Sequence, residues 1–308
     1  MKITEEMIAP DLRRAGRFYK KLMGETACAK PPKLRHTDPG GRLFETLLRR
    51  DDGSYLRMLI TKPKKRDRVP GVLWLHGGGF LTGMPEMVHF SPAHIIKNDC
   101  VIVSPDYTLS SKKPYPAALL DCYAALLWMV KNADSLGIDS ERIYVGGESA
   151  GGGLCVSVCM LAKRLGCVNI ACQMPLYPML DDRMESASMK DNDAPVWNEN
   201  RNSQAWALYL RGLKEIPALA APGRADDVSD LPPAISFVGG VDPFRDEAAA
   251  DISKLCSAGI FVDFCEFPGC FHAFDMMVPW SKEARAAAKF FKKSFRRACG
   301  TYRAAQPK

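Results

Sequence analysis

The sequence lacks several features that would place the chain in other protein classes. It has no Cys-x-x-Cys pair, and its eleven cysteines are odd in number and irregularly spaced. This pattern disfavours a disulfide framework and a zinc ribbon. No apolar run approaches the roughly 20 residues that a membrane-spanning helix needs. Neither Gly-x-Gly-x-x-Gly nor Gly-x(4)-Gly-Lys-Ser/Thr occurs, so these dinucleotide- and phosphate-binding motifs are absent. We expect a protein with no cofactor, no metal and no membrane span.

Signals for secretion are missing too. The first residues, Met1 to Glu6, include acids and have no apolar signal core, and no Asn-x-Ser/Thr sequon is present, so we expect a cytoplasmic protein. The formal charge of +7 raises the question of a nucleic-acid partner. Much of this charge lies in two helix-like segments, Arg13 to Lys21 and Lys289 to Arg297, where it fits the solvated faces of amphipathic helices. We expect no nucleic-acid partner.

Hydrophobic patterning predicts one α/β domain over residues 1–308. A helix over 3–24 and a hairpin of strands over 43–50 and 54–61 precede an alternation of strands and helices. The expected strands cover 71–75, 100–104, 142–146, 171–176, 234–238 and 260–267, and the expected helices 116–132, 150–165, 243–257 and 281–297. Such alternation is typical of a mostly parallel, doubly wound sheet with helices on both faces.

One segment interrupts this alternation. Residues 181–230 are rich in Pro, Asp, Asn and Trp and contain a single expected helix over 200–213. A long excursion in a compact domain is usually a functional insertion such as a lid.

A candidate nucleophile stands between an expected strand and an expected helix, in Gly147-Glu148-Ser149-Ala150-Gly151. A sharp strand–turn–helix with small flanking residues is the context of a nucleophile elbow, which exposes the serine hydroxyl. The alternative is a glycine-rich turn that caps the helix or binds a phosphate. A serine needs a base to become a good nucleophile.

His272 is the candidate base, because it follows the last expected strand, at the edge where a doubly wound sheet places its active site. His36, His89 and His94 are more simply surface or packing residues. Asp242 follows another strand and is the candidate acid that orients the imidazole. Its alternative role is to cap the next helix, with Pro243 at the first helical position, and Asp246 is the second choice of acid.

A glycine run, His76-Gly77-Gly78-Gly79-Phe80, offers bare backbone N–H groups to an oxyanion. Together with the N–H of Ala150, the residue after the nucleophile, it would stabilise a tetrahedral intermediate. His272 would deprotonate Ser149, an acyl-enzyme would form, and water would hydrolyse it.

At this point the sequence resembles the hormone-sensitive-lipase-like family of α/β-hydrolase esterases, which includes acetyl esterases and arylacetamide deacetylases. The likeness starts near residue 40. It includes the glycine run, the elbow, the chain order Ser149, Asp242, His272, and Asp106-Tyr107, Pro116-Ala117-Ala118, Tyr177 to Arg183, Asp242 to Glu247 and Pro268 to His272.

The resemblance implies an α/β-hydrolase fold with a helical cap, formed by about 1–40 and 181–225, over a core of 41–180 and 226–308. It implies oxyanion donors at Gly78, Gly79 and Ala150. It further implies a serine carboxylesterase for small-molecule esters with short acyl chains. Dimers are common in the family, so the resemblance makes a homodimer possible and leaves the oligomeric state open.

Two positions depart from the family pattern. The residue before the nucleophile is usually Asp and here is Glu148, which keeps the charge on a longer arm. The stretch Asp106-Tyr107-Thr108-Leu109-Ser110-Ser111-Lys112 lacks the Arg and Glu of the family's Asp-Tyr-Arg-Leu-Ala-Pro-Glu. Because the Arg and the Glu are both absent, neither is left as an unpaired charge. We therefore expect altered loop packing with an intact triad.

Other functions remain open at this stage. The fold also serves as a plant hormone receptor that has lost the catalytic histidine, and the triad also suits small amides. The retained His272 argues against the first, and the chain has no room for the propeller domain of oligopeptidases. Candidate pocket walls, each equally consistent with plain core packing, are Phe80, Trp197, Trp206 and Phe271.

Overall fold

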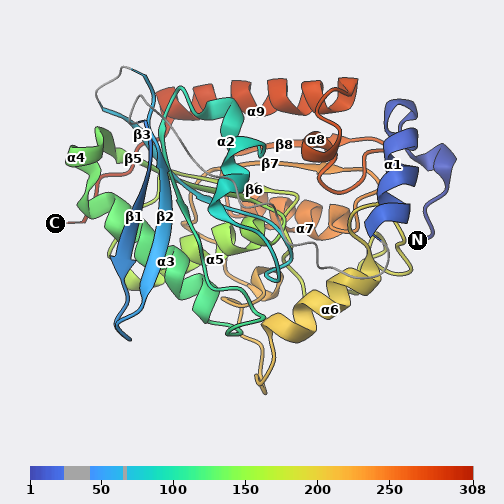
Figure 1. The fold of residues 1–308 in the computed structure, drawn as a ribbon, viewed down its shortest axis with the longest axis horizontal. Helices are drawn as coiled ribbons and strands as arrows, with labels where there is room; N and C mark the ends of the chain where they lie inside the picture. The colour runs from blue at the N-terminus through green and yellow to red at the C-terminus, as the bar shows by residue number, and fades with distance from the viewer. Residues whose placement is uncertain (24–41, 65–67, 308) are drawn as a thin grey trace.

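Eight strands form one sheet at the centre of the molecule (Figure 1). The computed structural model describes residues 1–23, 42–64 and 68–307. In sheet order the strands are β1 (Leu43–Arg49), β2 (Tyr55–Thr61), β4 (Val101–Pro105), β3 (Val69–Leu75), β5 (Ile138–Glu148), β6 (Cys172–Leu176), β7 (Ala234–Gly239) and β8 (Val262–Phe267). Only β2 runs against its neighbours, and the other pairs are parallel.

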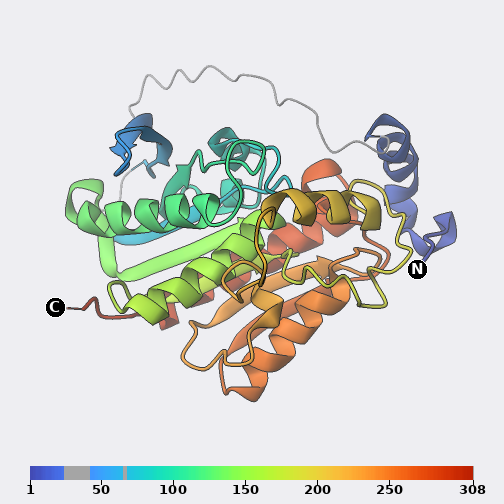
Figure 2. The ribbon, with the colours of Figure 1, turned by 90° about the horizontal axis from the view of Figure 1, so that it is seen from below.

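Helices cover both faces of the sheet. On one face lie α3 (Ala117–Lys131), α5 (Ala150–Leu165) and α7 (Arg245–Ser257), which Figure 2 shows in front of the strands. On the other lie α2 (Ala93–Ile96) and α9 (Lys282–Thr301), with α8 (Phe274–Met277) packed on α9. The remaining elements are α1 (Pro10–Met23), α4 (Ala133–Leu136), α6 (Glu199–Tyr209) and the 3-10 turns Glu5–Met7, Pro85–His89 and Pro222–Arg224.

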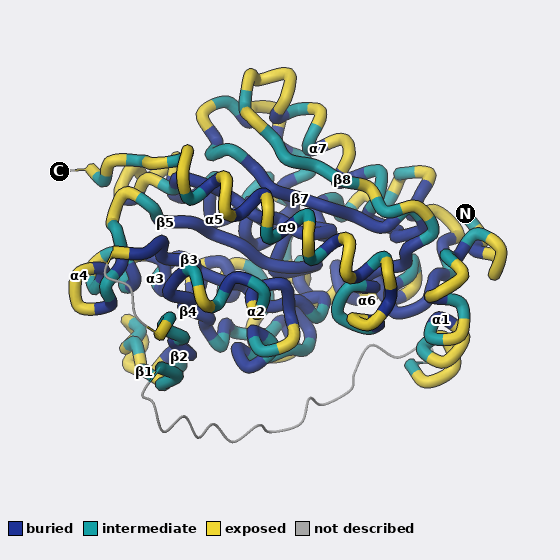
Figure 3. The backbone as a smooth tube through the Cα atoms, turned by 90° about the horizontal axis from the view of Figure 1, so that it is seen from above, coloured by how far each residue is buried: buried dark blue, intermediate teal, exposed yellow. Residues whose placement is uncertain are grey.

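The core divides into two apolar layers, one on each side of the sheet. Every residue of β3 is buried, as expected for a central parallel strand. Its side chains alternate, with Leu73 and Leu75 in the layer under α3 and α5 and Val72 and Trp74 in the layer under α9. Figure 3 shows the buried central strands beneath helices whose outer turns are exposed.

These observations confirm the expected α/β fold class, and they correct several element boundaries. The helix over 150–165 is found at its expected bounds. The expected helix over 3–24 begins at Pro10, since proline suits the first turn but not the interior of a helix. The helix over 200–213 ends at Tyr209, just before Gly212 at φ +88°. Residues 24–41, which include part of the expected cap segment over 1–40, lie outside the described part of the chain.

The exposed face of α9 carries basic residues, as expected from the sequence. On α9 the basic residues Lys289, Lys293, Arg296 and Arg297 are exposed. The opposite face of that helix buries Phe291 and Phe295. Cys155 and Cys159 are buried free thiols on α5. Within the described ranges, no helix is both long and apolar enough to cross a bilayer.

The packing of α9 on the sheet generates a prediction. Phe291 is fully buried and meets Trp74 edge-on at a centroid distance of 6.0 Å. We expect Phe291→Ala to lower the free energy of unfolding by about 3–5 kcal/mol, because it leaves a cavity in the layer. Phe18, 58% exposed on α1, is the matched control, and its change to alanine should cost less than about 0.5 kcal/mol. Equal losses in urea unfolding would contradict this layer assignment.

Candidate active site

The backbone at Ser149 has the strained geometry of a nucleophile elbow. Ser149 follows the last residue of β5 and precedes the first of α5, with φ 59° and ψ −121°. A positive φ is uncommon for a residue other than glycine, and strain of this kind clusters at functional sites. Its N–H donates to Leu176 O at 3.0 Å, and its carbonyl accepts from Gly153 N and Met179 N at 3.0 Å each. These bonds hold the turn against the end of β6.

The two glycines of the elbow are required by close backbone contacts. A Cβ at Gly147 would lie 2.5 Å from the carbonyl oxygens of both Gly151 and Leu75. A Cβ at Gly151 would overlap the Leu75 carbonyl oxygen. The turn therefore packs directly on the end of β3, where the glycine run begins.

Ser149, His272 and Asp242 form a continuous hydrogen-bonded chain. Ser149 Oγ lies 2.9 Å from His272 Nε2, and His272 Nδ1 lies 2.8 Å from Asp242 Oδ2. Because a carboxylate only accepts, Nδ1 carries the proton, and Nε2 is free to accept from the serine hydroxyl. The residues Ser149, His272 and Asp242 are 5%, 3% and 0% exposed, respectively. They come from the ends of β5, β8 and β7.

Of the two roles that the sequence left open for Asp242, the structure shows the contact with the imidazole, whereas α7 has no side-chain cap at its N-terminus. Asp242 Oδ2 binds His272, while its Oδ1 accepts the N–H of Phe244 at 2.9 Å. The expected helix start at Pro243 is wrong, because α7 begins at Arg245 and Pro243 lies in the preceding turn. Asp246, the second choice of acid, accepts from Ser188 N at 2.7 Å and pairs with Arg245.

Aromatic rings surround the imidazole. Tyr177 and Phe244 meet His272 edge-on, each at a centroid distance of 5.1 Å, and Trp197 lies at 6.1 Å. The sequence assigned no role to Tyr177 or Phe244, although both lie in the segments that carry the family resemblance. These rings fix the imidazole plane and keep water away from it.

The glycine run has three consecutive peptide planes whose carbonyls are bound. The His76 carbonyl accepts the Tyr107 hydroxyl at 2.8 Å, and the Gly77 carbonyl lies 2.8 Å from His76 Nδ1. The Gly78 carbonyl accepts from the N–H groups of Leu81 at 3.0 Å and Thr82 at 3.1 Å. In a trans peptide the N–H points opposite to the C=O. The bound carbonyls therefore fix the directions of the N–H groups of Gly78 and Gly79.

Those directions leave free donors near the serine. Within the described residues, no hydrogen bond joins the N–H of Gly78, Gly79 or Ala150 to another group. Gly78 and Gly79 have φ of +112° and +61°, a region that glycine adopts readily. A Cβ at Gly77 would lie 3.3 Å from Ser149 Cβ, so the run lies beside the elbow.

His76 is a buried, neutral member of this loop. Burial lowers its pKa to about 4, and its ring stacks on Tyr107 at a centroid distance of 4.1 Å. His94 contacts Lys97 and His89 lies in a 3-10 turn, so neither belongs to the triad. His36 lies outside the described residues.

The first departure from the family pattern, Glu148, has two specific partners. Its Oε2 accepts the indole N–H of Trp74 at 2.7 Å, and its Oε1 accepts the N–H of Gly77 at 3.0 Å. The side chain is 1% exposed. Burial raises its pKa to about 8, with Asp275 adding to the rise and the two hydrogen bonds opposing it.

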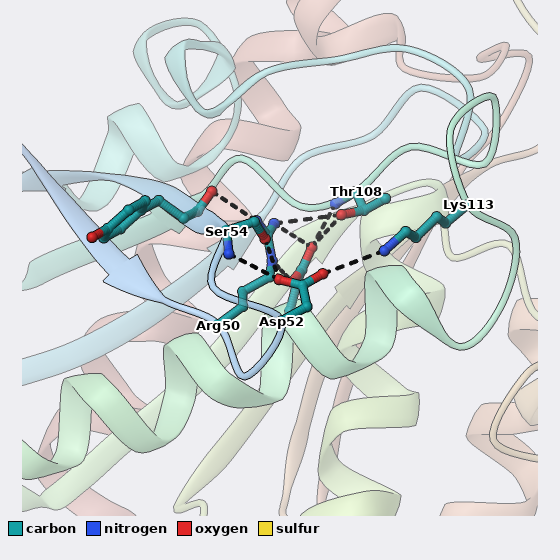
Figure 4. A network of polar contacts seen from close by, with 7 residues as sticks. Arg50, Asp52, Ser54, Thr108 and Lys113 are labelled. Atoms are coloured by element: carbon teal, nitrogen blue, oxygen red, sulfur yellow. Dashed lines mark hydrogen bonds and ion pairs between the residues drawn. The ribbon is translucent and has the colours of Figure 1, made fainter.

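The second departure, the loop Asp106 to Lys112 without the family's Arg and Glu, is held by residues from elsewhere in the chain. Asp121 Oδ2 accepts from both the N–H and the hydroxyl of Thr108, at 2.8 and 2.7 Å. Arg50, at the end of the β1–β2 hairpin, binds the same carboxylate with Nε at 2.6 Å and Nη2 at 2.9 Å. Figure 4 shows Arg50 and Thr108 converging, with the exposed pair of Lys113 and Asp52 beside them. Arg50 thus supplies a guanidinium to a loop that has none of its own.

The candidate pocket walls divide between the two sides of the sheet. Trp197 touches Gly79 closely enough that a Cβ there would overlap its ring. Phe80 stacks on Tyr209 at 3.9 Å and lies 5.7 Å from Trp206. Phe271 belongs instead to the layer under α9 and faces α1, because it would lie 3.5 Å from a Cβ on Gly16.

In the described ranges, no group of three or more His, Cys, Asp or Glu side chains could hold a metal.

Comparison with known proteins identifies the class. A family model described as alpha/beta hydrolase fold matches residues 72–276. The chain belongs to this α/β-hydrolase family, which confirms the expected fold and resemblance. Carboxylesterase NlhH of Mycobacterium tuberculosis is 35% identical over 232 residues, which are 72% of each chain. The arylesterase of Saccharolobus solfataricus is 31% identical over 248 residues, covering 77% of this chain and 78% of that one.

Solved structures agree with this assignment. A bacterial heroin esterase superposes with a TM-score of 0.84 at 29% identity, covering 96% of this chain and 99% of that one. Esterase LipW from Mycobacterium marinum has a TM-score of 0.83 at 26% identity, covering 96% and 97%.

The buried carboxyl of Glu148 generates a prediction about pH. The ordinary pKa of 4.5 applies in the unfolded chain, against about 8 when folded. Between these values the folded protein holds a proton that the unfolded chain has released, so the free energy of unfolding falls as pH rises. We therefore expect wild type to lose stability relative to Glu148→Gln from about pH 5 to about pH 8, and the difference to level off above that.

Urea unfolding across this range measures the difference. Burial raises the pKa of Asp275 to about 6, so this residue also makes the free energy of unfolding fall as pH rises. It does so in both proteins, and its effect largely cancels in the difference between them. A stability difference that does not change with pH would contradict the prediction.

Proposed function

We propose that the protein hydrolyses carboxylic esters with Ser149 as nucleophile, His272 as general base and Asp242 as the acid that orients it. The observation that carries this proposal is the hydrogen-bonded chain from Ser149 Oγ through His272 to Asp242, at 2.9 and 2.8 Å. The esterases among its relatives and structural neighbours support the same reaction class.

The reaction proceeds through an acyl-enzyme. His272 Nε2 takes the proton of Ser149 as Oγ attacks the ester carbonyl, and Asp242 stabilises the resulting imidazolium. The imidazolium then gives its proton to the leaving alcohol. In the second half, water loses a proton to His272 and attacks the acyl carbonyl, and the imidazolium returns the proton to Ser149 Oγ as the carboxylic acid is released.

The N–H groups of Gly78, Gly79 and Ala150 are the proposed oxyanion donors. Support comes from the bound carbonyls of the glycine run, which preset the N–H directions before substrate arrives. Donors that need no reorganisation are worth on the order of 3 kcal/mol each in the transition state.

Residues 1–40 and 181–225 are proposed as the cap over a core of 41–180 and 226–308. The described parts of both segments contact each other. Ile3 N donates to Asp193 Oδ1 at 2.8 Å, and a Cβ at Gly16 would lie 3.2 Å from Pro195. Trp197, from the same segment, packs on Gly79 and faces His272.

This placement of Trp197 supports a preference for short acyl chains. A large ring against Gly79 takes up space beside the proposed oxyanion donors, and Ser149 itself is only 5% exposed. A small acyl group fits such a closely packed centre better than a long one. A cytoplasmic location and a homodimer stay predictions from the sequence and the resemblance.

A series of p-nitrophenyl esters from acetate to palmitate tests the proposal. We expect turnover to be fastest with short acyl chains, and Ser149→Ala to lower kcat by about 10⁴-fold or more. Asp242→Asn should lower it by on the order of 10⁴-fold, because the imidazole then takes the wrong tautomer. Asp246→Asn, which changes the second choice of acid, is the matched control and should stay close to wild type.

The outcomes separate the parts of the proposal. Full activity in Ser149→Ala would remove the nucleophile assignment. Equal rates on acetate and emulsified palmitate would remove the short-chain preference. A wild type without turnover on any ester would favour a binding protein on the same fold.

A further inference from the structure

Glu148 connects the nucleophile to the glycine run. It is the last residue of β5, directly before Ser149, yet its carboxyl oxygens accept from Gly77 N at 3.0 Å and from Trp74 Nε1 at 2.7 Å on the neighbouring chain segment. The backbones are equally close, because a Cβ at Gly77 would lie 3.0 Å from the Glu148 carbonyl oxygen. The elbow and the run therefore meet through one side chain.

The bond to Gly77 completes the fixing of the glycine run. Tyr107, His76 and the N–H groups after Gly79 hold the three carbonyls of the run. Glu148 binds the N–H of the first peptide plane, between His76 and Gly77. Consecutive glycines have the greatest backbone freedom of any residue, so a loop made of them needs partners outside itself to hold one conformation.

The length of the side chain matters for this contact. An aspartate would carry its carboxylate about 1.5 Å nearer its own backbone. It could not reach both Gly77 N and Trp74 Nε1 from the end of β5 unless the glycine run moved. A glutamine keeps the length and one acceptor oxygen, but its amide group then faces one of the two donors.

We propose that Glu148 is a positioning residue for ester hydrolysis, which sets the placement of the Gly78 and Gly79 N–H groups relative to Ser149 Oγ by binding Gly77. The inference rests on the proposed function. It assigns Glu148 no contact with substrate. A misplaced donor weakens transition-state binding and leaves ground-state binding nearly unchanged, so the effect belongs in kcat.

The test compares Glu148→Asp and Glu148→Gln with a matched control. Asp251→Asn removes another buried carboxyl, 6% exposed on α7, that has no part in the site. Steady-state kinetics on p-nitrophenyl acetate give kcat and KM, and an organophosphate titration gives the concentration of active sites. Inhibition by a trifluoromethyl ketone, which forms a tetrahedral adduct with the serine, reports on how well the site stabilises that adduct, to which the oxyanion donors contribute.

We expect Glu148→Asp to lower kcat per active site by about 10- to 100-fold, with KM within about 3-fold of wild type. Its inhibition constant for the ketone should rise in parallel with the loss in kcat. Glu148→Gln should lose less, about 3- to 10-fold, because it keeps one bond. Asp251→Asn should match wild type in all three quantities.

Several results would overturn the inference. One is a kcat of Glu148→Asp within about 3-fold of wild type, and another is an effect of this variant on KM alone. An unchanged ketone inhibition constant in Glu148→Asp, or an equal loss of kcat in Asp251→Asn, would also contradict it. If Glu148→Asp does not fold, Glu148→Gln provides the test. A wild-type kcat in Glu148→Gln would then contradict the inference. A wild type that hydrolyses no ester and is not labelled at Ser149 would instead remove the proposed function itself.

Discussion

The close contact between the end of β5 and the end of β3 is the constraint on which the site depends. Ser149 is held at φ 59°, and such strain persists only where the surroundings over-determine the backbone. Gly147 and Gly151 permit the contact, because a side chain at either position would collide with the Leu75 carbonyl. Parallel strands bring their carboxyl ends to one edge of the sheet, so β7 and β8 deliver Asp242 and His272 to the same place.

Burial determines the electrostatics of this site. Where water is excluded, hydrogen bonds and charges act more strongly. Burial also disfavours the charged forms of titratable groups. It lowers the pKa of His76 to about 4 and raises that of Glu148 to about 8. A neutral His76 can donate from Nδ1 to the Gly77 carbonyl without placing a positive charge beside the nucleophile. The oxyanion would then be the main new charge to be stabilised in the glycine run.

Local patterns in the sequence were sufficient to predict that three separate polar residues lie together and to predict most of the fold. Ser149, Asp242 and His272 each follow a β-prone run, and strand ends in a parallel sheet meet, so their proximity could be inferred. Contacts between distant segments could not be inferred. Arg50 reaches Asp121 across 71 residues of sequence, and Phe271 lies beside His272 in sequence but faces the opposite layer. Both depend on the packing of whole elements, which periodicity does not encode.

The structure of a covalent trifluoromethyl ketone adduct tests the central claim most directly. The claim is that Ser149, the glycine run and the start of α5 form one preset site for a tetrahedral intermediate. It predicts that Ser149 Oγ is bonded to the ketone carbon, and that the adduct oxygen lies about 2.7–3.1 Å from the N–H nitrogens of Gly78, Gly79 and Ala150. An adduct oxygen that points to solvent, or a glycine run that has to rearrange to reach it, would contradict the account.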